Sequence, residues 1–521
     1  MTGEKNLTYF LFWQIGEIFA IDGMGPNLIK YPCFIKERSF RMEFFGRKEI
    51  LAQLDDLWGK RCSSFVTCRG RRRIGKSTLI ERFAAQSKAR FIKIEGLKPS
   101  AEVNDEKERK MFAAQLAAQS SASAICPENW LQAFIGLSAE IDDRERTVVL
   151  IDETSWLAYY DDTFAGTLKI AWDNYLKAHD RLIFVVCGSV STWIRDNIVD
   201  NGAFYGRRSL DIIVPELPLA DCVKFWGKRA SRMSTKDIYD VLSVTGGVPR
   251  YLEELKPSLS AVENIRRMCF LPKAILREGF DAMFQDVITE QPRLCGKVLR
   301  TLVDGPRSVV EIAAALGVEK GGDISKALLQ LSESGMVSGN EGRNPETGAR
   351  IREVRYRLSD NYVRFYLKYI EPDKDIIDDG TYSFTGFDQF MAWDTILGFA
   401  FENLVIRNYR ELLSPLHLDK AVLKSAAPYR KNGSKKAGEP GLQIDLLIQT
   451  SMSMCLVEIK RRKVVDLKVV DEVKEKVRRF KCPAETTLRL VLVYEGELDR
   501  KVEASGYFDA IINARSLLGL C

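Results

Sequence analysis

The residues with the strongest chemical meaning lie at positions 70–77, where glycines, a lysine and a serine follow the spacing G-x-x-x-x-G-K-S. Segment 63–68 has the pattern of a short buried strand and precedes them, and a helical pattern follows at 79–83. A strand, a glycine-rich loop and a helix in this order wrap backbone N–H groups around phosphates at a helix N-terminus. Because the neighbouring segments agree with the motif, a chance match is the weaker interpretation.

This loop predicts an ATP site with magnesium. We expect Lys76 to reach the β- and γ-phosphates and the Ser77 hydroxyl to ligate Mg²⁺. The predicted nucleotide-binding residues are Gly70, Arg71, Arg72, Arg73, Ile74, Gly75, Lys76, Ser77 and Thr78.

Two carboxylates follow the apolar segment 147–151, which has the composition of a buried parallel strand. Ligands bind at the carboxyl ends of strands in open α/β sheets, so Asp152 and Glu153 are expected beside the phosphate loop. We predict that Asp152 holds the magnesium, directly or through water. Glu153 is predicted to orient and deprotonate the attacking water, which favours hydrolysis over binding alone. The alternative is that these acids only cap the next helix.

Further polar residues are candidates for contact with the γ-phosphate. The apolar segment 182–187 ends at Gly188-Ser189, and Ser189 is predicted to sense the γ-phosphate between the phosphate loop and the acidic strand end. Arg207 and Arg208 are candidates for an arginine finger, acting in cis or across subunits. The alternative for this arginine pair is a solvated surface feature.

A second group of charged residues lies near the C-terminus. Segments 442–448 and 454–460 have strand patterns, joined by a segment short enough for a hairpin. Asp445 on the first strand and Glu458-x-Lys460 on the second follow the pattern D…(D/E)-x-K of magnesium-dependent nucleases.

The chemistry of this pattern depends on convergence of the side chains. Residues two apart on a strand point to the same face, so Glu458 and Lys460 converge. Asp445 and Glu458 are predicted to hold Mg²⁺, with Lys460 stabilising the developing charge. Glu402, on the predicted helix 395–409, could complete the acidic set. The alternative is that these charges simply alternate along solvated strands.

Between the two groups, the sequence predicts three helices and a β-hairpin. The helices are expected from residue 291 and over 309–316 and 323–334, and residues 336–358 alternate as a hairpin does. This order is typical of a winged helix-turn-helix. The hairpin contains five arginines facing three glutamates: Arg343, Arg350, Arg352, Arg355 and Arg357 against Glu341, Glu346 and Glu353. Contact with DNA and a role as a lid or protein contact are both open.

Composition sets the remaining limits. The 521 residues are too many for one core, so several domains are expected. Their 77 basic and 71 acidic residues give a net charge of only +6, which supplies no whole-chain argument for nucleic-acid binding. Two histidines, His179 and His417, cannot build a multi-histidine metal site. The 11 cysteines lack C-x-x-C spacing, which predicts the reduced thiols of a cytoplasmic protein.

The N-terminal residues are predicted to lie outside the folded domains. The apolar segment 9–21 is too short and too polar to span a bilayer, and no later segment reaches that length. Met42 opens a segment with the character of a domain start, so residues 1–41 are expected to be a loose extension. A short ordered arm is the alternative.

Five motifs occur in a fixed order: Phe45-Gly46-Arg47-Lys48-Glu49, the arginine-rich phosphate loop, Asp152-Glu153, Gly188-Ser189, and Gly246-Gly247-Val248-Pro249-Arg250-Tyr251. Together they resemble the archaeal-ATPase family, P-loop proteins related to AAA+ initiators and to STAND signalling ATPases. The resemblance covers roughly residues 42–370. It implies an αβα nucleotide-binding core, a helical lid carrying the Gly-Gly-x-Pro motif, and a winged helix. Ser77 stands where threonine is commoner, which leaves its predicted magnesium role unchanged.

The C-terminal group resembles the PD-(D/E)xK, restriction-endonuclease-like tail known in this family, which includes degenerate copies. The resemblance also implies a setting in mobile-element or host-defence biology. All four predicted residues of the tail are present, which argues against degeneracy.

These observations predict an α/β protein with five parts. They are an extension at 1–41, a P-loop ATPase core at 42–215, a helical lid at 216–285, a winged helix at 286–372 and a restriction-endonuclease-like α/β domain at 373–521. We expect ATP and Mg²⁺ as cofactors, DNA as a partner, homo-oligomers, and no membrane association.

The expected function is ATP hydrolysis whose nucleotide state controls the winged helix and a nuclease-like tail acting on DNA. Two alternatives are open. One is a STAND-like signalling or scaffold ATPase with a non-catalytic tail. The other is a DNA-binding regulator that uses the winged helix.

Overall fold

The computed structural model describes residues 43–520 apart from 61, 123, 190, 289–290, 320, 341, 352–353, 420 and 434–439. The chain divides into two units, residues 1–44 and 45–521, and the second contains every described helix and strand. The predicted extension at 1–41 lies outside the described residues. Among the described helices, none has both the length and the apolar composition needed to cross a bilayer.

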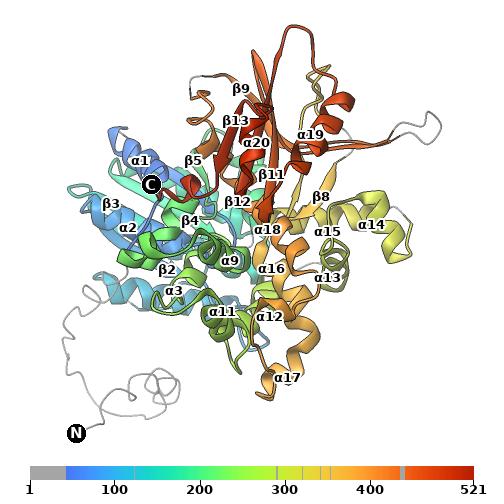
Figure 1. The fold of residues 1–521 in the computed structure, drawn as a ribbon. Coiled ribbons are helices and arrows are strands. Elements are labelled where there is room, and N and C mark those ends of the chain that lie inside the picture. Colours follow the sequence, from blue (N-terminus) through green and yellow to red (C-terminus); the bar gives the residue numbers. More distant parts are fainter. Residues whose placement is uncertain are drawn as a thin grey trace. The chain divides into compact units, whose positions relative to one another are not determined.

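A parallel five-stranded sheet lies in the N-terminal part of this unit (Figure 1). Its strands are β1 (Ser64–Arg69), β2 (Arg90–Glu95), β3 (Thr147–Asp152), β4 (Leu182–Gly188) and β5 (Arg208–Ile213), in the order β2-β3-β4-β1-β5. Because all neighbours are parallel, the carboxyl ends of the strands share one edge of the sheet. Strand β4 separates β1 from β3, so the residue after β4 lies between the phosphate loop and the acidic strand end.

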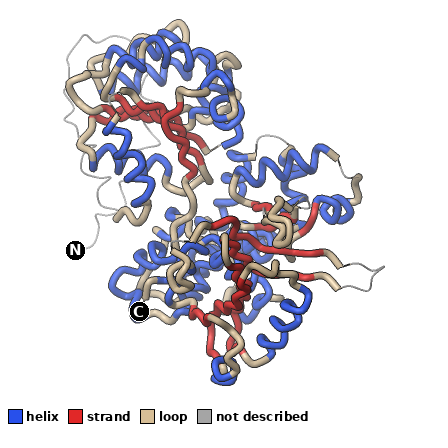
Figure 2. The backbone as a smooth tube through the Cα atoms, turned by 90° about the horizontal axis from the view of Figure 1, so that it is seen from above, coloured by secondary structure: helices blue, strands red, loops and turns tan. Residues whose placement is uncertain are grey.

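Helices cover both faces of this sheet (Figure 2). They include α1 (Lys48–Asp56), α2 (Lys76–Gln86), α3 (Asp105–Gln119), α4 (Trp130–Ala139), α5 (Thr154–Leu157), α6 (Phe164–Asn174) and α7 (Ser191–Ile194). Strands β3 and β4 are buried along their whole length, as expected of apolar strands covered on both faces. Aromatic side chains from α3, α4 and α6 fill the core on one face, among them Phe112, Trp130 and Phe164.

Five helices follow the sheet. They are α8 (Leu219–Cys222), α9 (Thr235–Thr245), α10 (Pro249–Leu252), α11 (Ala261–Cys269) and α12 (Ile275–Val287). Residues 238–245 of α9 are all buried, because this helix packs against α11 and against two helices from later in the chain, α16 (Asn361–Phe365) and α18 (Trp393–Arg407). Gly247 follows α9, and a side chain there would meet the Leu217 carbonyl, since a Cβ atom would lie 2.5 Å from its oxygen.

Three helices and a small antiparallel sheet occupy residues 292–358. They are α13 (Pro292–Thr301), α14 (Val309–Leu316), α15 (Gly322–Glu333), β6 (Arg307–Ser308), β7 (Val337–Gly339) and β8 (Arg355–Leu358), with strand order β6-β8-β7. Ser308 and Glu311 form a capping box at the start of α14, which explains why the helix begins where predicted. The predicted helices are present, and the hairpin strands are shorter than the alternation predicts.

Aromatic packing runs across the predicted boundary at residue 373. After α16 and α17 (Lys374–Asp378), the rings of Phe384 and Phe390 stack on Phe270 and Tyr369. Residues 374–392 therefore pack against the helices that precede the boundary.

The C-terminal part is built on a mixed five-stranded sheet with order β13-β12-β11-β10-β9. Its elements are α18, β9 (Leu423–Lys431), β10 (Leu442–Thr450), β11 (Ser453–Val465), α19 (Lys468–Arg479), β12 (Thr487–Leu498), α20 (Arg500–Ala504) and β13 (Ala510–Asn513). Helix α18 packs on β11, and valines of α19 enter the hydrophobic core of the sheet. The basic residues 429–431 pair with β10 as part of β9, and residues 434–439 lie outside the described part.

Candidate active sites

The phosphate loop joins β1 to α2 as predicted. Gly75 precedes the helix with φ 84°, a left-handed conformation that favours glycine. The buried Lys76 ammonium donates to the carbonyl oxygens of Gly70, at 3.1 Å, and of Arg71, at 3.3 Å. The lysine therefore bonds to the loop itself, at the position from which it would reach a phosphate. Thr78 lies in the first turn of α2.

The acidic strand end meets the start of α2. The Ser77 hydroxyl donates to Oδ2 of Asp152 at 2.5 Å, and Asp152 is only 4% exposed. A hydroxyl and a carboxylate that converge in this way are oxygen donors of the kind that Mg²⁺ prefers. The donor set fits the predicted metal.

The backbone of Glu153 has a conformation that is unfavourable in free energy. Its φ and ψ are both 46°, a left-handed backbone that a residue with a side chain rarely adopts without a functional or structural cause. The Ser189 amide donates to its carboxylate at 3.1 Å, and the Ser189 hydroxyl lies 2.9 and 3.0 Å from its two oxygens. The structure thus brings Ser189 and Glu153 together beside Asp152.

Lys93 of β2 is a further charged residue at this edge. Its ammonium lies 3.6 Å from Oδ2 of Asp152 and 3.4 Å from Glu81. Although burial opposes the charged form, Asp152 and the other nearby carboxylates raise the pKa of Lys93. The lysine therefore keeps its positive charge next to the predicted magnesium ligand.

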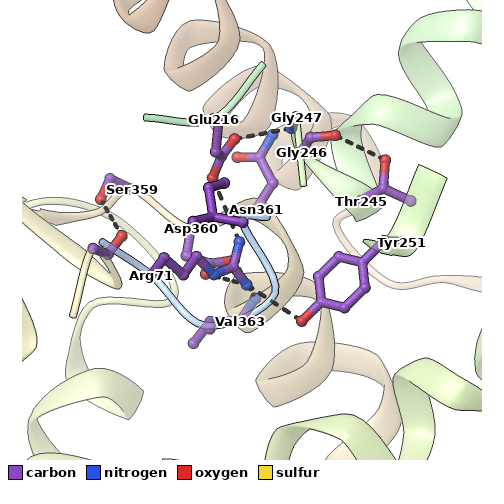
Figure 3. A network of polar contacts seen from close by, with 12 residues as sticks. Arg71, Glu216, Thr245, Gly246, Gly247, Tyr251, Ser359, Asp360, Asn361 and Val363 are labelled. Carbon is purple, nitrogen blue, oxygen red and sulfur yellow. Dashed lines mark hydrogen bonds and ion pairs between the residues drawn. The ribbon is translucent and has the colours of Figure 1, made fainter. Parts of the chain in front are cut away.

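The phosphate loop contains three consecutive arginines, at positions 71–73, and their surroundings include helices that follow the sheet in the chain. Arg71 is buried, its Nη2 lies 2.6 Å from Oδ2 of Asp360, and its guanidinium lies over the ring of Tyr251 (Figure 3). The guanidinium of Arg73 lies 5.8 Å from the centre of the same ring. Burial lowers the pKa of Arg72, and the negative charge of Glu153 acts in the opposite direction. The arginine-rich sequence thus extends the loop's contacts toward Tyr251 of the Gly-Gly-Val-Pro-Arg-Tyr motif and the residue before α16.

A cavity of about 760 Å³ adjoins the loop. Its walls come from the phosphate loop, the segment after β5, the end of α15 and the end of α18; they include Arg47, Gly70, Arg71, Glu216, Glu333 and Arg407. The volume lies in the range of small-molecule sites. Residues far apart in the sequence therefore share the walls of one cavity at the phosphate loop.

The predicted arginine finger is not at this site. Arg208 pairs in register with Phe65, at the start of β1, whereas the phosphate loop follows the end of that strand. Arg207 makes a bidentate ion pair with Asp173, with N–O distances of 2.7 and 2.9 Å. The cis form of the prediction is therefore wrong, because both arginines lie at the opposite edge of the sheet. A role across subunits stays a prediction.

The C-terminal residues converge as their spacing predicts. The backbone N–H of Ile459 donates to Oδ2 of Asp445 at 3.0 Å, which places Asp445 beside the second strand. Lys460 lies 2.7 Å from Oε1 of Glu458. Burial and the neighbouring Asp445 raise the pKa of Glu458, and burial together with Glu402 raises the pKa of Asp445. Two buried carboxylates and a lysine thus share one face of the sheet.

Lys476 of α19 joins this group. Its ammonium lies 2.6 Å from Oε2 of Glu458 and 3.7 Å from Oδ1 of Asp445. A positive charge therefore already sits between the two carboxylates predicted to bind a metal. Among the described residues, no group of three or more His, Cys, Asp or Glu side chains is arranged to hold a metal ion. Mg²⁺ at this place would be coordinated by the two carboxylates, with water or phosphate oxygens completing its coordination shell.

Glu402 stands at one side of the group. It accepts a hydrogen bond from Nη2 of Arg357 at 3.1 Å, and it lines a small cavity together with Asp445 and Arg430. Arg357 belongs to β8, so the predicted winged helix contributes a wall of this cavity. Glu402 is near the acidic pair but is engaged by an arginine.

The hairpin arginines do not form one exposed basic surface. Arg355 and Arg357 are buried, and they pair with Glu311 at 2.6 Å and with Glu402 at 3.1 Å. Each of these two arginines points toward a carboxylate of a neighbouring helix. Arg343 and Arg350 are exposed, whereas Arg352, Glu341 and Glu353 lie outside the described residues.

Comparison with known proteins agrees with the N-terminal geometry. Residues 44–255 match the family model of an ATPase domain found predominantly in Archaea. This part of the chain has an α/β P-loop ATPase-like core. The matched residues include the phosphate loop, Asp152-Glu153, Ser189 and the motif at 246–251. The predicted resemblance over roughly 42–370 is thus supported as far as residue 255.

Individual relatives are distant. An uncharacterized protein of Methanocaldococcus jannaschii is 23% identical over 366 residues, which is 69% of this chain and 76% of that protein. A Walker-type ATPase of Pyrococcus abyssi is 18% identical, covers 63% of this chain and 97% of its own, and has a TM-score of 0.45. The ORC2 protein of Aeropyrum pernix, in complexes with ADPNP and ADP, is 14% identical, covers 66% and 98%, and has a TM-score of 0.37.

Proposed function

We propose that this protein binds ATP with magnesium at the phosphate loop and hydrolyses it. The observation that carries the proposal is the 2.5 Å contact between Ser77 and Asp152, next to a glutamate held by Ser189. Bound Mg²⁺ would neutralise charge on the β- and γ-phosphates, with Ser77 and Asp152 as its protein ligands. Lys76 would bind the phosphates, and Glu153 would accept a proton from the attacking water once its bond to Ser189 is exchanged.

The test is steady-state ATP hydrolysis by the full chain, with Lys76→Ala and Lys110→Ala compared. Lys110 is a matched control because it pairs with Glu106 on an exposed helix face. We expect Mg²⁺-dependent hydrolysis that Lys76→Ala removes and Lys110→Ala retains. Equal hydrolysis by all three proteins would refute the proposal.

We propose further that residues 292–358 form a winged helix and that the C-terminal part is a PD-(D/E)xK nuclease-like domain acting on DNA. Support comes from Asp445, Glu458 and Lys460 on paired strands, with Lys476 as a cation between the carboxylates. The carboxylate pair would hold Mg²⁺, which supplies polarisation of the scissile phosphate and a more acidic bound water. Lys460 and Lys476 would stabilise negative charge as the P–O bond breaks.

Cleavage of plasmid and linear DNA by wild type and Asp445→Asn, with and without Mg²⁺, tests the second proposal. Metal-dependent cleavage that the variant loses would support it. A signalling or scaffold ATPase with a non-catalytic tail is favoured instead if no metal supports cleavage and nucleotide changes the size of the assembly.

A further inference from the structure

Helix α18 contributes a side chain to each candidate site. Arg407, its last residue, forms an ion pair with Glu216 and lines the cavity beside the phosphate loop. Glu402, one and a half turns earlier, accepts from Arg357 and lines the small cavity that contains Asp445. At about 1.5 Å rise per residue, the two positions lie roughly 7–8 Å apart along the helix axis. A small shift of this helix would therefore move groups at both sites.

One carboxylate joins this helix to the phosphate loop. Glu216, with 11% of its side chain exposed, pairs with Arg407 and lies 3.5 Å from Nη1 of Arg71. Its other oxygen accepts from the Gly247 amide at 2.9 Å (Figure 3). Because the contact between Arg71 and Glu216 is largely buried, salt screens it little. The position of Arg71 and the position of α18 are thus set by the same side chain.

A second connection runs through the residues before and within α16. Asp360 pairs with Arg71 at 2.6 Å. Its neighbour Asn361 donates to the Ala400 carbonyl of α18 at 3.2 Å and accepts from Asn403 of α18 at 3.0 Å. The side chains of Arg71, Asp360, Asn361 and Asn403 are buried, whereas those of Glu216 and Arg407 are partly exposed. Arg71 therefore contacts α18 by two routes, one through Glu216 and one through Asp360-Asn361.

Nucleotide binding must change the contacts of Arg71. The Lys76 ammonium bonds to the Arg71 carbonyl in this structure, and a triphosphate would draw that ammonium to its own oxygens. A ligand shifts a conformational equilibrium only where it contacts the two states differently, and Lys76 supplies such a difference.

We infer that a nucleoside triphosphate at the phosphate loop regulates the Asp445–Glu458 site by moving α18 through Arg71, Glu216 and Arg407. The inference rests on the proposed nucleotide site, and it specifies how nucleotide bound there would control the C-terminal site. Coupling of this kind is reciprocal, so DNA bound at the tail changes nucleotide affinity by the same factor.

Hydrogen exchange of peptides covering residues 393–407 tests this inference without requiring cleavage activity. The full-length protein is compared with and without the non-hydrolysable analogue ADPNP and Mg²⁺. The variants are Glu216→Gln, which keeps the shape of the side chain, and Arg407→Gln. Arg300→Gln is the control, since Arg300 makes an exposed ion pair with Glu371 outside this network. Calorimetric titration with ADPNP measures nucleotide binding by each protein.

In wild type and Arg300→Gln, ADPNP is expected to change exchange rates in α18 by about fivefold, the lower end of typical coupling. In Glu216→Gln and Arg407→Gln, the analogue is expected to bind while the change in exchange of α18 is smaller than in wild type, because only the route through Asp360-Asn361 remains. Binding with no change in α18 of wild type would overturn the inference and leave the proposed ATP site standing. A response in both variants equal to wild type would also overturn it. If wild type does not bind ADPNP, the proposed function fails and the inference with it.

Discussion

The Ser77 hydroxyl donates to the Asp152 carboxylate across 2.5 Å, which joins the first turn of α2 to the end of β3. Two segments separated by 75 positions thus present adjacent oxygen donors at the end of the phosphate loop. Such donors suit Mg²⁺ bound to a phosphate.

Removal of the Ser77 hydroxyl should weaken magnesium-dependent nucleotide binding. Ser77→Ala deletes one of the two donors, whereas Ser77→Thr keeps the hydroxyl. We expect Ser77→Ala to lower kcat/KM for ATP by roughly 10²-fold, comparable to loss of one charge-stabilising contact, and Ser77→Thr to stay near wild type. ATP hydrolysis measured across a Mg²⁺ titration checks this. Identical magnesium dependence of the two variants would contradict the assigned ligand.

Glu153→Gln should separate binding from hydrolysis. The amide keeps the shape of the side chain but cannot take a proton, so we expect kcat to fall about 10²–10⁴-fold with nucleotide affinity little changed. Single-turnover hydrolysis together with a binding titration measures both quantities. Glu140→Gln serves as the control, because Glu140 follows α4 away from the phosphate loop. Hydrolysis by Glu153→Gln at the rate of this control would assign the general base elsewhere.

Tail variants should lose DNA cleavage and retain ATP hydrolysis. Glu458→Gln removes one predicted metal ligand, and Lys476→Met removes the ammonium that contacts it. We expect both to reduce cleavage by roughly 10²-fold or more. Asp471→Asn is the control, since Asp471 is exposed on the same helix as Lys476. Cleavage by Glu458→Gln as fast as by Asp471→Asn would show that the carboxylate pair is structural.

Breaking the buried Arg71–Asp360 pair should be costly. Asp360→Ala leaves a buried guanidinium without this partner, and we expect a loss of about 3–5 kcal/mol in the free energy of unfolding. Urea denaturation followed by circular dichroism measures it. Arg71→Met combined with Asp360→Leu removes both charges and should cost much less. A single variant as stable as wild type would mean that the pair contributes nothing.

Glu108 should make stability depend on pH near neutrality. The side chain is fully buried, and burial raises its pKa to about 7. Between the unfolded pKa, near 4.3, and 7 the folded state binds more protons than the unfolded state, so stability falls as pH rises through this window. Glu108→Gln should remove this part of the slope. Urea unfolding at pH 5 and pH 8 checks it, and parallel slopes for the two proteins would argue against a protonated Glu108.

Motifs that are contiguous in sequence were the most predictable features. The phosphate loop, the strand ending at Asp152 and the strands carrying Asp445 and Glu458 were predicted because each depends on local spacing and strand periodicity. Lys93 and Lys476 were missed, since each enters its site from another element and has no local pattern that distinguishes it from a solvated lysine.

Burial and tertiary pairing could not be predicted from local patterns. The hairpin arginines Arg355 and Arg357 alternate as surface residues do, but their carboxylate partners lie on helices that the pattern does not place. The network of Arg71, Glu216 and Arg407 spans residues from three parts of the chain, so only the folded arrangement brings it together.

Calorimetric titration of the full chain with ADPNP in the presence of Mg²⁺ tests the central claim most directly. Wild type should bind one nucleotide per chain, and Lys76→Ala should bind at least roughly 10²-fold more weakly, because it lacks the ammonium that contacts the phosphates. Equal affinity of the two proteins, or no binding by wild type, would contradict the assignment of the phosphate loop as the nucleotide site.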